Sequence, residues 1–176
     1  MKKIQKIDVS VGLLAGFSCF GFLINLPIWA LFIGWAWYFA LVATGVVFKT
    51  AIPPMLTGSL MAVLAIILID VFAGFMPFLL GMIIAVTITV FCLMLTLKIP
   101  ACSYSLVSFN AYSCMFAGYY AGFYYETGSY AGNFVTAILW ITGANFLGLL
   151  FGWTSIALTN IGAKKEEKEE KEEKDV

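Results

Sequence analysis

Residues 49–98 read KTAIPPMLTGSLMAVLAIILIDVFAGFMPFLLGMIIAVTITVFCLMLTLK, in which two lysines enclose 48 residues that carry one charge, Asp70. A transmembrane helix needs about 20 apolar residues to cross about 30 Å of hydrocarbon, so this interval is long enough for two crossings and too long for one. The segment from Asp70 to Pro77 supplies a turn, because proline disfavours the continuation of a helix. The stretch therefore predicts a transmembrane hairpin with both lysines on one side of the membrane.

The same spacing recurs on both sides of this hairpin. The intervals Lys6–Lys49 and Lys98–Lys164 enclose 42 and 65 residues, with turn signals at residues 25–27 and 126–129. Cytoplasmic loops of membrane proteins carry an excess of lysine and arginine. The sequence thus predicts an all-α integral membrane protein, a bundle of six transmembrane helices with both termini cytoplasmic. The expected spans are residues 9–26, 28–48, 51–71, 75–97, 100–125 and 132–158.

Two features of this span count stay open. If residues 28–48 form a re-entrant or broken segment, the count becomes five or seven, because non-helical backbone is tolerated at membrane depth where protein or water covers it. Six spans also fit a three-plus-three inverted repeat, a common transporter plan, although the two halves show no convincing residue-level match. In either case the expected division is an N-terminal segment 1–8, a membrane domain 9–163 and a tail 164–176.

The composition predicts that lipid is the solvent for most of the chain. The 176 residues are 62% hydrophobic and 11% charged, with a mean hydropathy of +0.96. A soluble domain is about half apolar and about a quarter charged. Residues 9–163 carry four charges, namely Lys49, Asp70, Lys98 and Glu126. The excess of apolar side chains is too large for a soluble core of this size.

The tail repeats lysine and glutamate and has no apolar face to bury. We expect it to be disordered, or at most a solvated helix supported by Glu–Lys pairs four positions apart. It would serve as a solubilising end or as a docking handle.

Pairs of glycines recur four positions apart in three of the expected spans. They are Gly12 and Gly16, Gly118 and Gly122, and Gly148 and Gly152. Such pairs let helix backbones approach closely in lipid. They indicate a tightly packed bundle and leave a homo-oligomer open.

Polar side chains concentrate in the fifth expected span, on two opposite faces of a helix. One face carries Ser103, Asn110 and Ser113, and the other carries Ser105, Ser108 and Tyr112. A helix that is polar on both sides is expected to be buried among its neighbours. Asn110 and Asn145 fall near the middle of their spans.

These polar residues have two interpretations. They either hold helices together by hydrogen bonds of about 0.6–2 kcal/mol each, or line a polar route for an uncharged solute. The candidate pore-lining residues are Ser105, Ser108, Asn110, Tyr112 and Asn145, with Trp35 and Tyr38 beside them.

The sequence contains no His, and no charged residue lies at the expected midplane of the membrane. These absences reduce the number of functions that we expect for the protein. General acid–base catalysis has no obvious residue to use, so we expect no enzyme and no catalytic residues. The four cysteines lie in apolar stretches without a CxxC pair, which predicts small buried side chains and no metal or cofactor. A carrier driven by ions usually needs charge inside the membrane, unless a shift of the third span buries Asp70.

The sequence therefore favours a passive channel or facilitator for a small neutral solute, or for a weak acid that crosses in its neutral form. The alternative is a structural or accessory membrane subunit without transport activity. The expected partners are the lipid bilayer and a small-molecule solute, with no nucleic acid.

Two stretches resemble a known family. They are residues 32–40, FIGWAWYFA, and residues 147–153, LGLLFGW. With the chain length and the six-span layout, they resemble small bacterial inner-membrane proteins grouped as domain of unknown function 1097. The resemblance implies a multi-pass location in the bacterial inner membrane. It implies no activity and transfers no site residues.

Overall fold

The computed structural model describes residues 4–41 and 43–174, and the side chains of these residues up to position 160. The regular structure in these ranges is helical. The elements are α1 (Lys6–Ser18), η1 (Cys19–Ile24), α2 (Ile28–Ala40), α3 (Val47–Ala73), α4 (Phe78–Thr96), η2 (Pro100–Cys102), α5 (Ser105–Tyr120), α6 (Tyr130–Ala137), η3 (Ile138–Thr142) and α7 (Gly143–Lys174). The elements η1 and η2 are 3-10 helices, and η3 is a single π-helical turn.

Four helical segments in the described ranges are long and apolar enough to cross a membrane. They are Lys6–Ile24, Val47–Ala73, Phe78–Thr96 and Tyr130–Asn160. The prediction of an all-α protein with membrane-spanning helices is confirmed at this level. The hairpin predicted from the opening stretch corresponds to α3 and α4.

The helices α2 and α5 are much shorter than their expected spans. The span predicted at residues 28–48 is wrong in extent, since α2 ends at Ala40 and α3 already begins at Val47. At 1.5 Å per residue, α2 with 13 residues is about 20 Å long and α5 with 16 residues is about 24 Å long. Each of the two follows a 3-10 helix, η1 before α2 and η2 before α5.

The connections form where the turn signals lie. Asn25 has a left-handed φ of 53° and ends η1, and Pro27 caps the start of α2. Gly122, with φ 77°, follows the end of α5, where glycine adopts the left-handed conformation without a Cβ penalty. Pro53 and Pro54 lie inside α3, one to two turns after its start.

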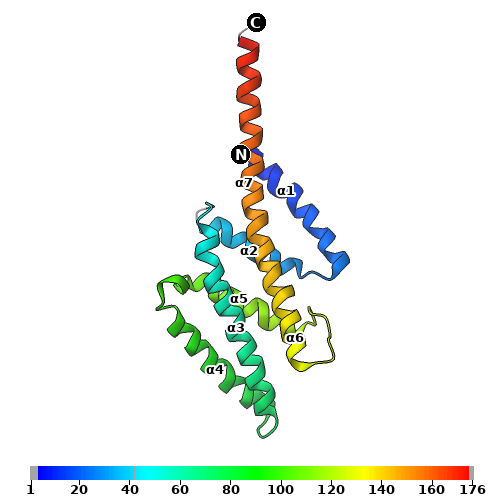
Figure 1. Ribbon diagram of the computed structural model, residues 1–176, viewed down its shortest axis with the longest axis vertical. Coiled ribbons are helices and arrows are strands. Elements are labelled where there is room, and N and C mark those ends of the chain that lie inside the picture. Colours follow the sequence, from blue (N-terminus) through cyan, green and yellow to red (C-terminus); the bar gives the residue numbers. More distant parts are fainter. Residues whose placement is uncertain (1–3, 42, 175–176) are drawn as a thin grey trace.

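The successive helices α1, α2, α3, α4 and α5 and the segment α6–α7 run in alternating directions (Figure 1). The start of α1, the start of α3 and the α4–α5 connection lie along the upper left flank of the view. The α1–α2, α3–α4 and α5–α6 connections lie along the opposite flank, at the lower right. We call the first flank the lysine end, because Lys6, Lys49 and Lys98 belong to it, and the second the acidic end, which includes Asp70 and Glu126.

The helices pack as two groups. In the first group, α1 and α2 pack against α7, which continues α6 and η3. In the second group, α4 and α5 pack against α3. Contacts between the groups are sparser and involve η3 with α3 and α5, α2 with α5, α5 with α6, and α3 with α7. Each group therefore has one long central helix, α7 or α3, and two shorter partners.

Glycines at two helix crossings allow backbones to touch. A Cβ at Gly34 of α2 would overlap the carbonyl of Asn145, and one at Gly148 of α7 would overlap the carbonyl of Leu31. A Cβ at Gly58 of α3 would overlap the carbonyl of Ser108. Gly12 and Gly16, in contrast, have open space around them, so that predicted pair is not a packing motif within this chain.

The tail continues α7 as a helix to Lys174. The backbone of the tail up to this residue is therefore helical, which is the alternative to disorder that the sequence allowed. Residues 1–3 and 175–176, and the tail side chains that were expected to form Glu–Lys pairs, lie outside the described part of the structure.

Candidate functional site

Polar side chains meet between the two helix groups. Asn145 of α7 lies against Cys114 of α5, and Thr142 of η3 lies against Ser59 of α3. We call these four residues the polar seam. All four are buried, and Thr142 and Asn145 are three positions apart, so they project from the same side of their helix toward the second group.

Asn145 joins three helices. Its side-chain Nδ2 donates to the carbonyl of Ala30 in α2 at 2.7 Å and lies 3.5 Å from the Sγ of Cys114 in α5. Its Oδ1 is buried and accepts no hydrogen bond from the described residues. A buried acceptor without a donor costs about 1–3 kcal/mol, so this oxygen is an unsatisfied position in the seam.

The second contact of the seam is a hydroxyl pair. Thr142 Oγ1 donates to Ser59 Oγ at 2.9 Å, and the exposed fraction of Ser59 is 1%. Thr142 is the last residue of the π-helix η3. π-helical turns occur often at functional sites, because the extra residue re-aims the side chains around it.

A cavity of about 320 Å³ lies beside the seam, between α2 and α5. Its lining residues are Trp29, Ile33, Asn110, Ser113, Cys114 and Ala117. Asn110, Ser113 and Ala117 follow the helical spacing that places them on one face of α5. Neither the amide of Asn110 nor the hydroxyl of Ser113 has a hydrogen-bond partner among the described residues. The cavity therefore combines an apolar wall from α2 with an unpaired polar wall from α5.

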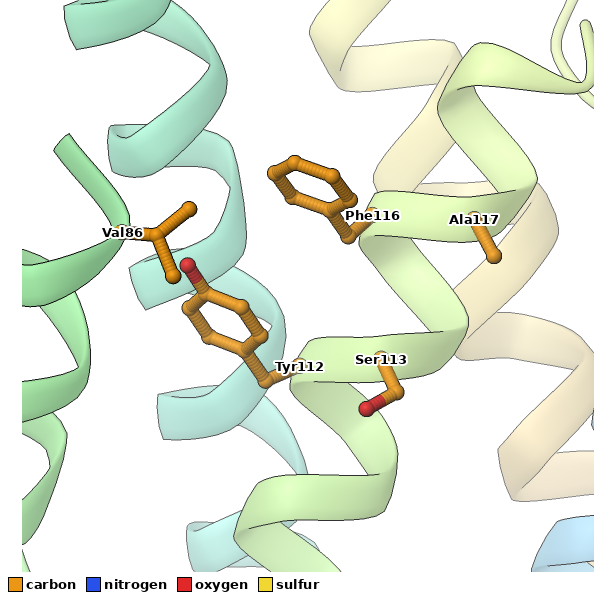
Figure 2. Close-up of a pocket in the computed structure, with 5 residues that line it drawn as sticks. All are labelled: Val86, Tyr112, Ser113, Phe116 and Ala117. Carbon is orange, nitrogen blue, oxygen red and sulfur yellow. The ribbon is translucent and has the colours of Figure 1, made fainter. Parts of the chain in front are cut away.

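Tyr112 lies on another side of α5 and faces a second cavity, of about 250 Å³. In Figure 2, Tyr112 and Phe116 point from α5 toward α4, where Val86 faces them, while Ser113 and Ala117 point elsewhere. The hydroxyl oxygen of Tyr112 lies 3.0 Å from the Oγ1 of Thr89, so this phenol is used to hold α4 against α5.

The other sequence-predicted liners lie apart from the cavity. Ser108 is fully buried where α5 crosses α3 at Gly58, and its Oγ has no partner in the described residues. Trp35 and Tyr38 are buried against α7, where Trp35 meets Phe151. Ser105 is exposed at the start of α5. The structure thus brings Asn110 and Asn145 near one site and separates the other five.

The expectation that both polar sides of α5 are buried is wrong. Ser108 and Tyr112 pack against α3 and α4, but Ser105 at the start of the same face is exposed, and so are Ser103 and Ser113 on the other face. The reason is that α3 covers one side of α5, while α2 and α4 contact it only sparsely.

Four residues of the seam and the cavity are not among the pore-lining residues predicted from the sequence, namely Ser59, Cys114, Thr142 and Ser113. The sequence predicts a small buried side chain at Cys114, and its exposed fraction is 1%. Its spacing of four from Asn110, on the face that carries Ser113, was the available signal. Ser59 and Thr142 carried no such signal, because their pairing depends on which helices are neighbours. The four cysteines are free thiols.

Apolar side chains close the lysine end of the interface between the groups. The cluster contains Trp37, Tyr38, Val47, Ala51, Met55, Val107, Ala111 and Leu149. It draws residues from both groups, with α2 and α7 on one side and α3 and α5 on the other. The polar seam therefore has an apolar plug between it and the lysines.

Comparison with known proteins gives one family. No curated protein and no solved structure matches the chain. A model of a family described as protein of unknown function, DUF1097, matches residues 8–160, which include every residue of the seam and of the cavity. The chain therefore belongs to the DUF1097 family.

Proposed function

We propose that the chain crosses the bacterial inner membrane six times, with both termini on the cytoplasmic side. The alternation of helix directions and the grouping of the lysines at one end support this topology. The four long helical segments supply four crossings, and α2 and α5 supply the other two. Of the two short helices, α5 is extended by η2, which precedes it, whereas η1 already belongs to the Lys6–Ile24 crossing.

The packing further supports a three-plus-three inverted repeat. If α1, α2 and α3 are matched to α4, α5 and the segment α6–α7, then the α2–α7 pair corresponds to α5–α3, and α1–α7 corresponds to α4–α3. At the first crossing the carbonyl of Leu31 lies over Gly148, and at the second the carbonyl of Ser108 lies over Gly58. Leu31 and Ser108 are each the fourth residue of their helix.

This register also aligns sequence. It places FIGWAWYFA (residues 32–40) beside FNAYSCMFA (residues 109–117). Both begin with Phe, continue with a small residue, an aromatic residue and a small residue at the third to fifth places, and end in Phe-Ala. The linear sequence does not reveal this match between the two halves, because the offset between them follows only from the packing of the helices.

We further propose that the protein is a passive facilitator for a small uncharged solute that hydrogen-bonds in the cavity between α2 and α5. The observation that carries this function is the unpaired polar lining of that cavity, Asn110 and Ser113, beside the buried Oδ1 of Asn145. Polar atoms without partners are costly at membrane depth, and a solute with donors and acceptors would satisfy them. No catalytic role is assigned.

The size and charge of the cavity restrict the solute. A volume of about 320 Å³ lies at the low end of the range of about 300–1,000 Å³ found for ligand pockets. The lining contains no charged side chain. Amides, short polyols and protonated short carboxylic acids fit both conditions.

The test is solute entry into liposomes that contain the purified full-length chain, followed by stopped-flow light scattering with urea, glycerol and acetic acid below its pKa. We expect at least one solute to enter faster than in protein-free vesicles. Asn110→Leu should slow this entry about fivefold, which corresponds to one neutral hydrogen bond of about 1 kcal/mol.

The matched control is Thr87→Leu. Thr87 is also a polar residue within a membrane-spanning segment, but it is exposed on α4 and its hydroxyl is bound to the carbonyl of Ile83, outside the cavity. Its replacement should leave the rate unchanged. Equal rates in protein-containing and empty vesicles for all three solutes would rule out a facilitator for these classes.

A second candidate function is an accessory subunit or a homo-oligomer. The exposed face of α5 favours it, because a partner helix would also satisfy Asn110 and Ser113. Oxidative cross-linking through Ser113→Cys, with Cys19, Cys92, Cys102 and Cys114 replaced by Ser, distinguishes the two. A cross-linked homodimer, together with inactive vesicles, would favour this candidate over transport.

A further inference from the structure

The two helix groups are tied together at the acidic end. The hydroxyl of Tyr130, the first residue of α6, donates to Oδ2 of Asp70 in the last turn of α3, with 2.6 Å between the oxygens. Both residues are exposed. A hydrogen bond from a phenol to a carboxylate is short and strong, because the acceptor carries a full charge.

An aromatic layer continues this contact. The ring of Tyr119, from α5, stacks on the ring of Phe134, from α6, with 4.9 Å between centroids and 10° between planes. Tyr130 packs with its edge against the same Phe134 at 5.0 Å. The exposed fraction of Phe134 is 6%, so this ring is the buried centre of the contact between the groups.

The π-helix η3 connects this contact to the polar seam, and its last residue, Thr142, belongs to the seam. Residues 130–134 of α6 carry the contact, η3 spans Ile138–Thr142, and Asn145 of the seam follows in α7. A π-helical turn lacks the regular i to i−4 ladder, which makes it a natural position for one helical segment to reorient relative to the next. The segment of α6 at the acidic end is thus joined to the residues of the seam through this π-helical turn.

From this arrangement we propose that Tyr130, Asp70, Tyr119 and Phe134 form a gate over the polar seam at the acidic end, and that α6 opens it by turning about η3. Opening breaks the Tyr130–Asp70 hydrogen bond, separates the Tyr119–Phe134 stack and exposes Cys114 and Asn145 to the acidic side. The apolar cluster at the lysine end stays closed in the same step. The biological role of this gate depends on the proposed function of the protein as a facilitator.

The buried thiol of Cys114 reports the opening. With Cys19, Cys92 and Cys102 replaced by Ser, Cys114 is the remaining thiol of the full-length chain. In intact cells, a membrane-impermeant cationic methanethiosulfonate reagent should label Cys114 slowly from outside. Tyr130→Phe should raise that rate about tenfold, the factor that corresponds to one hydrogen bond to a charged group. Asp70→Asn, which keeps a neutral acceptor, should raise it by less.

The matched control is Tyr125→Phe in the same background. This change also removes one phenol hydroxyl near the acidic end, but that hydroxyl donates to the carbonyl of Ile24 and does not bind α3. Its labelling rate should equal that of the parent. Equal acceleration by the Tyr125 and Tyr130 changes, or no acceleration by the Tyr130 change, would overturn the gate.

A locked variant guards against a simple loss of folding. Asp70→Cys combined with Tyr130→Cys, bridged by a short bifunctional thiol cross-linker in place of the lost Tyr–Asp pair, should reduce labelling of Cys114 below the parental rate, and mass spectrometry identifies the labelled thiol. Persistent labelling in the locked form would contradict the gate. Because the assay needs no solute, labelling that follows this pattern in a protein that transports nothing would keep the gate and reject the facilitator.

Discussion

At the scale of single residues, Asn145 depends on a glycine. The backbone carbonyl of Asn145 lies where a Cβ at position 34 would be. The side chain of Asn145 donates to the carbonyl of Ala30, which lies on α2 like Gly34. Gly34 therefore sets how closely α2 approaches α7, and this distance sets whether Asn145 can bridge α2 and α5. One hydrogen atom in place of a methyl group determines the geometry of the seam.

We expect Gly34→Ala to lower the free energy of unfolding by about 1–3 kcal/mol, the usual cost of overpacking a well-packed contact. The added methyl group must push α2 away from α7, because the neighbour is backbone and cannot rotate aside. Thermal unfolding in detergent, followed by circular dichroism, measures the loss. Gly16→Ala is the matched control, since nothing lies within 4 Å of its Cβ position, and it should be neutral or slightly stabilising.

At the scale of one element, α5 has a packed side and an open side. Ser108 is fully buried over Gly58, whereas Ser113, five residues later, is exposed beside the cavity. The same residue type therefore has two different roles on one helix. The sequence pattern cannot separate these roles, because each serine has polar neighbours at helical spacing on its own face of α5.

Ser108→Leu and Ser113→Leu should differ sharply. The first places a large side chain into a closed crossing and should reduce the unfolding midpoint by several degrees, as expected for overpacking of 1 kcal/mol or more. The second adds apolar surface on an exposed face and should leave the midpoint unchanged. Similar midpoints for the two variants would show that α5 is oriented differently in the membrane.

At the scale of the whole molecule, the two helix groups and their alternating directions place the lysines together. A topology test follows. In a background with the four cysteines replaced by Ser, Lys49→Cys and Lys98→Cys should react only with membrane-permeant maleimides in intact cells, and Glu126→Cys should also react with impermeant ones. Labelling of position 49 or 98 by an impermeant reagent would reject the six-crossing topology.

Much of the helix order was predictable, because the interval between lysines is set by the thickness of the bilayer. The turns after Asn25 and Asp70 were read from proline and polar residues, and the structure has them there. The start of α2 at Ile28 agrees with the predicted span, but its C-terminal end was not predictable, since an apolar run does not reveal where a helix stops when lipid or protein satisfies its side chains. Asn110 and Asn145 were found by polarity at mid-span. The pairing of Ser59 with Thr142, and the role of Cys114, depend on helix neighbours that a single sequence does not specify.

The continuity of α7 has a mechanical consequence. One helix runs from Gly143, two residues before Asn145, to Lys174 in the charged tail, without a break. At 1.5 Å per residue its 32 residues form a rod of about 48 Å. If a partner protein bound the tail and tilted this helix, the movement would be transmitted along α7. The side-chain amide of Asn145, near the start of α7, would then shift relative to α2 and α5.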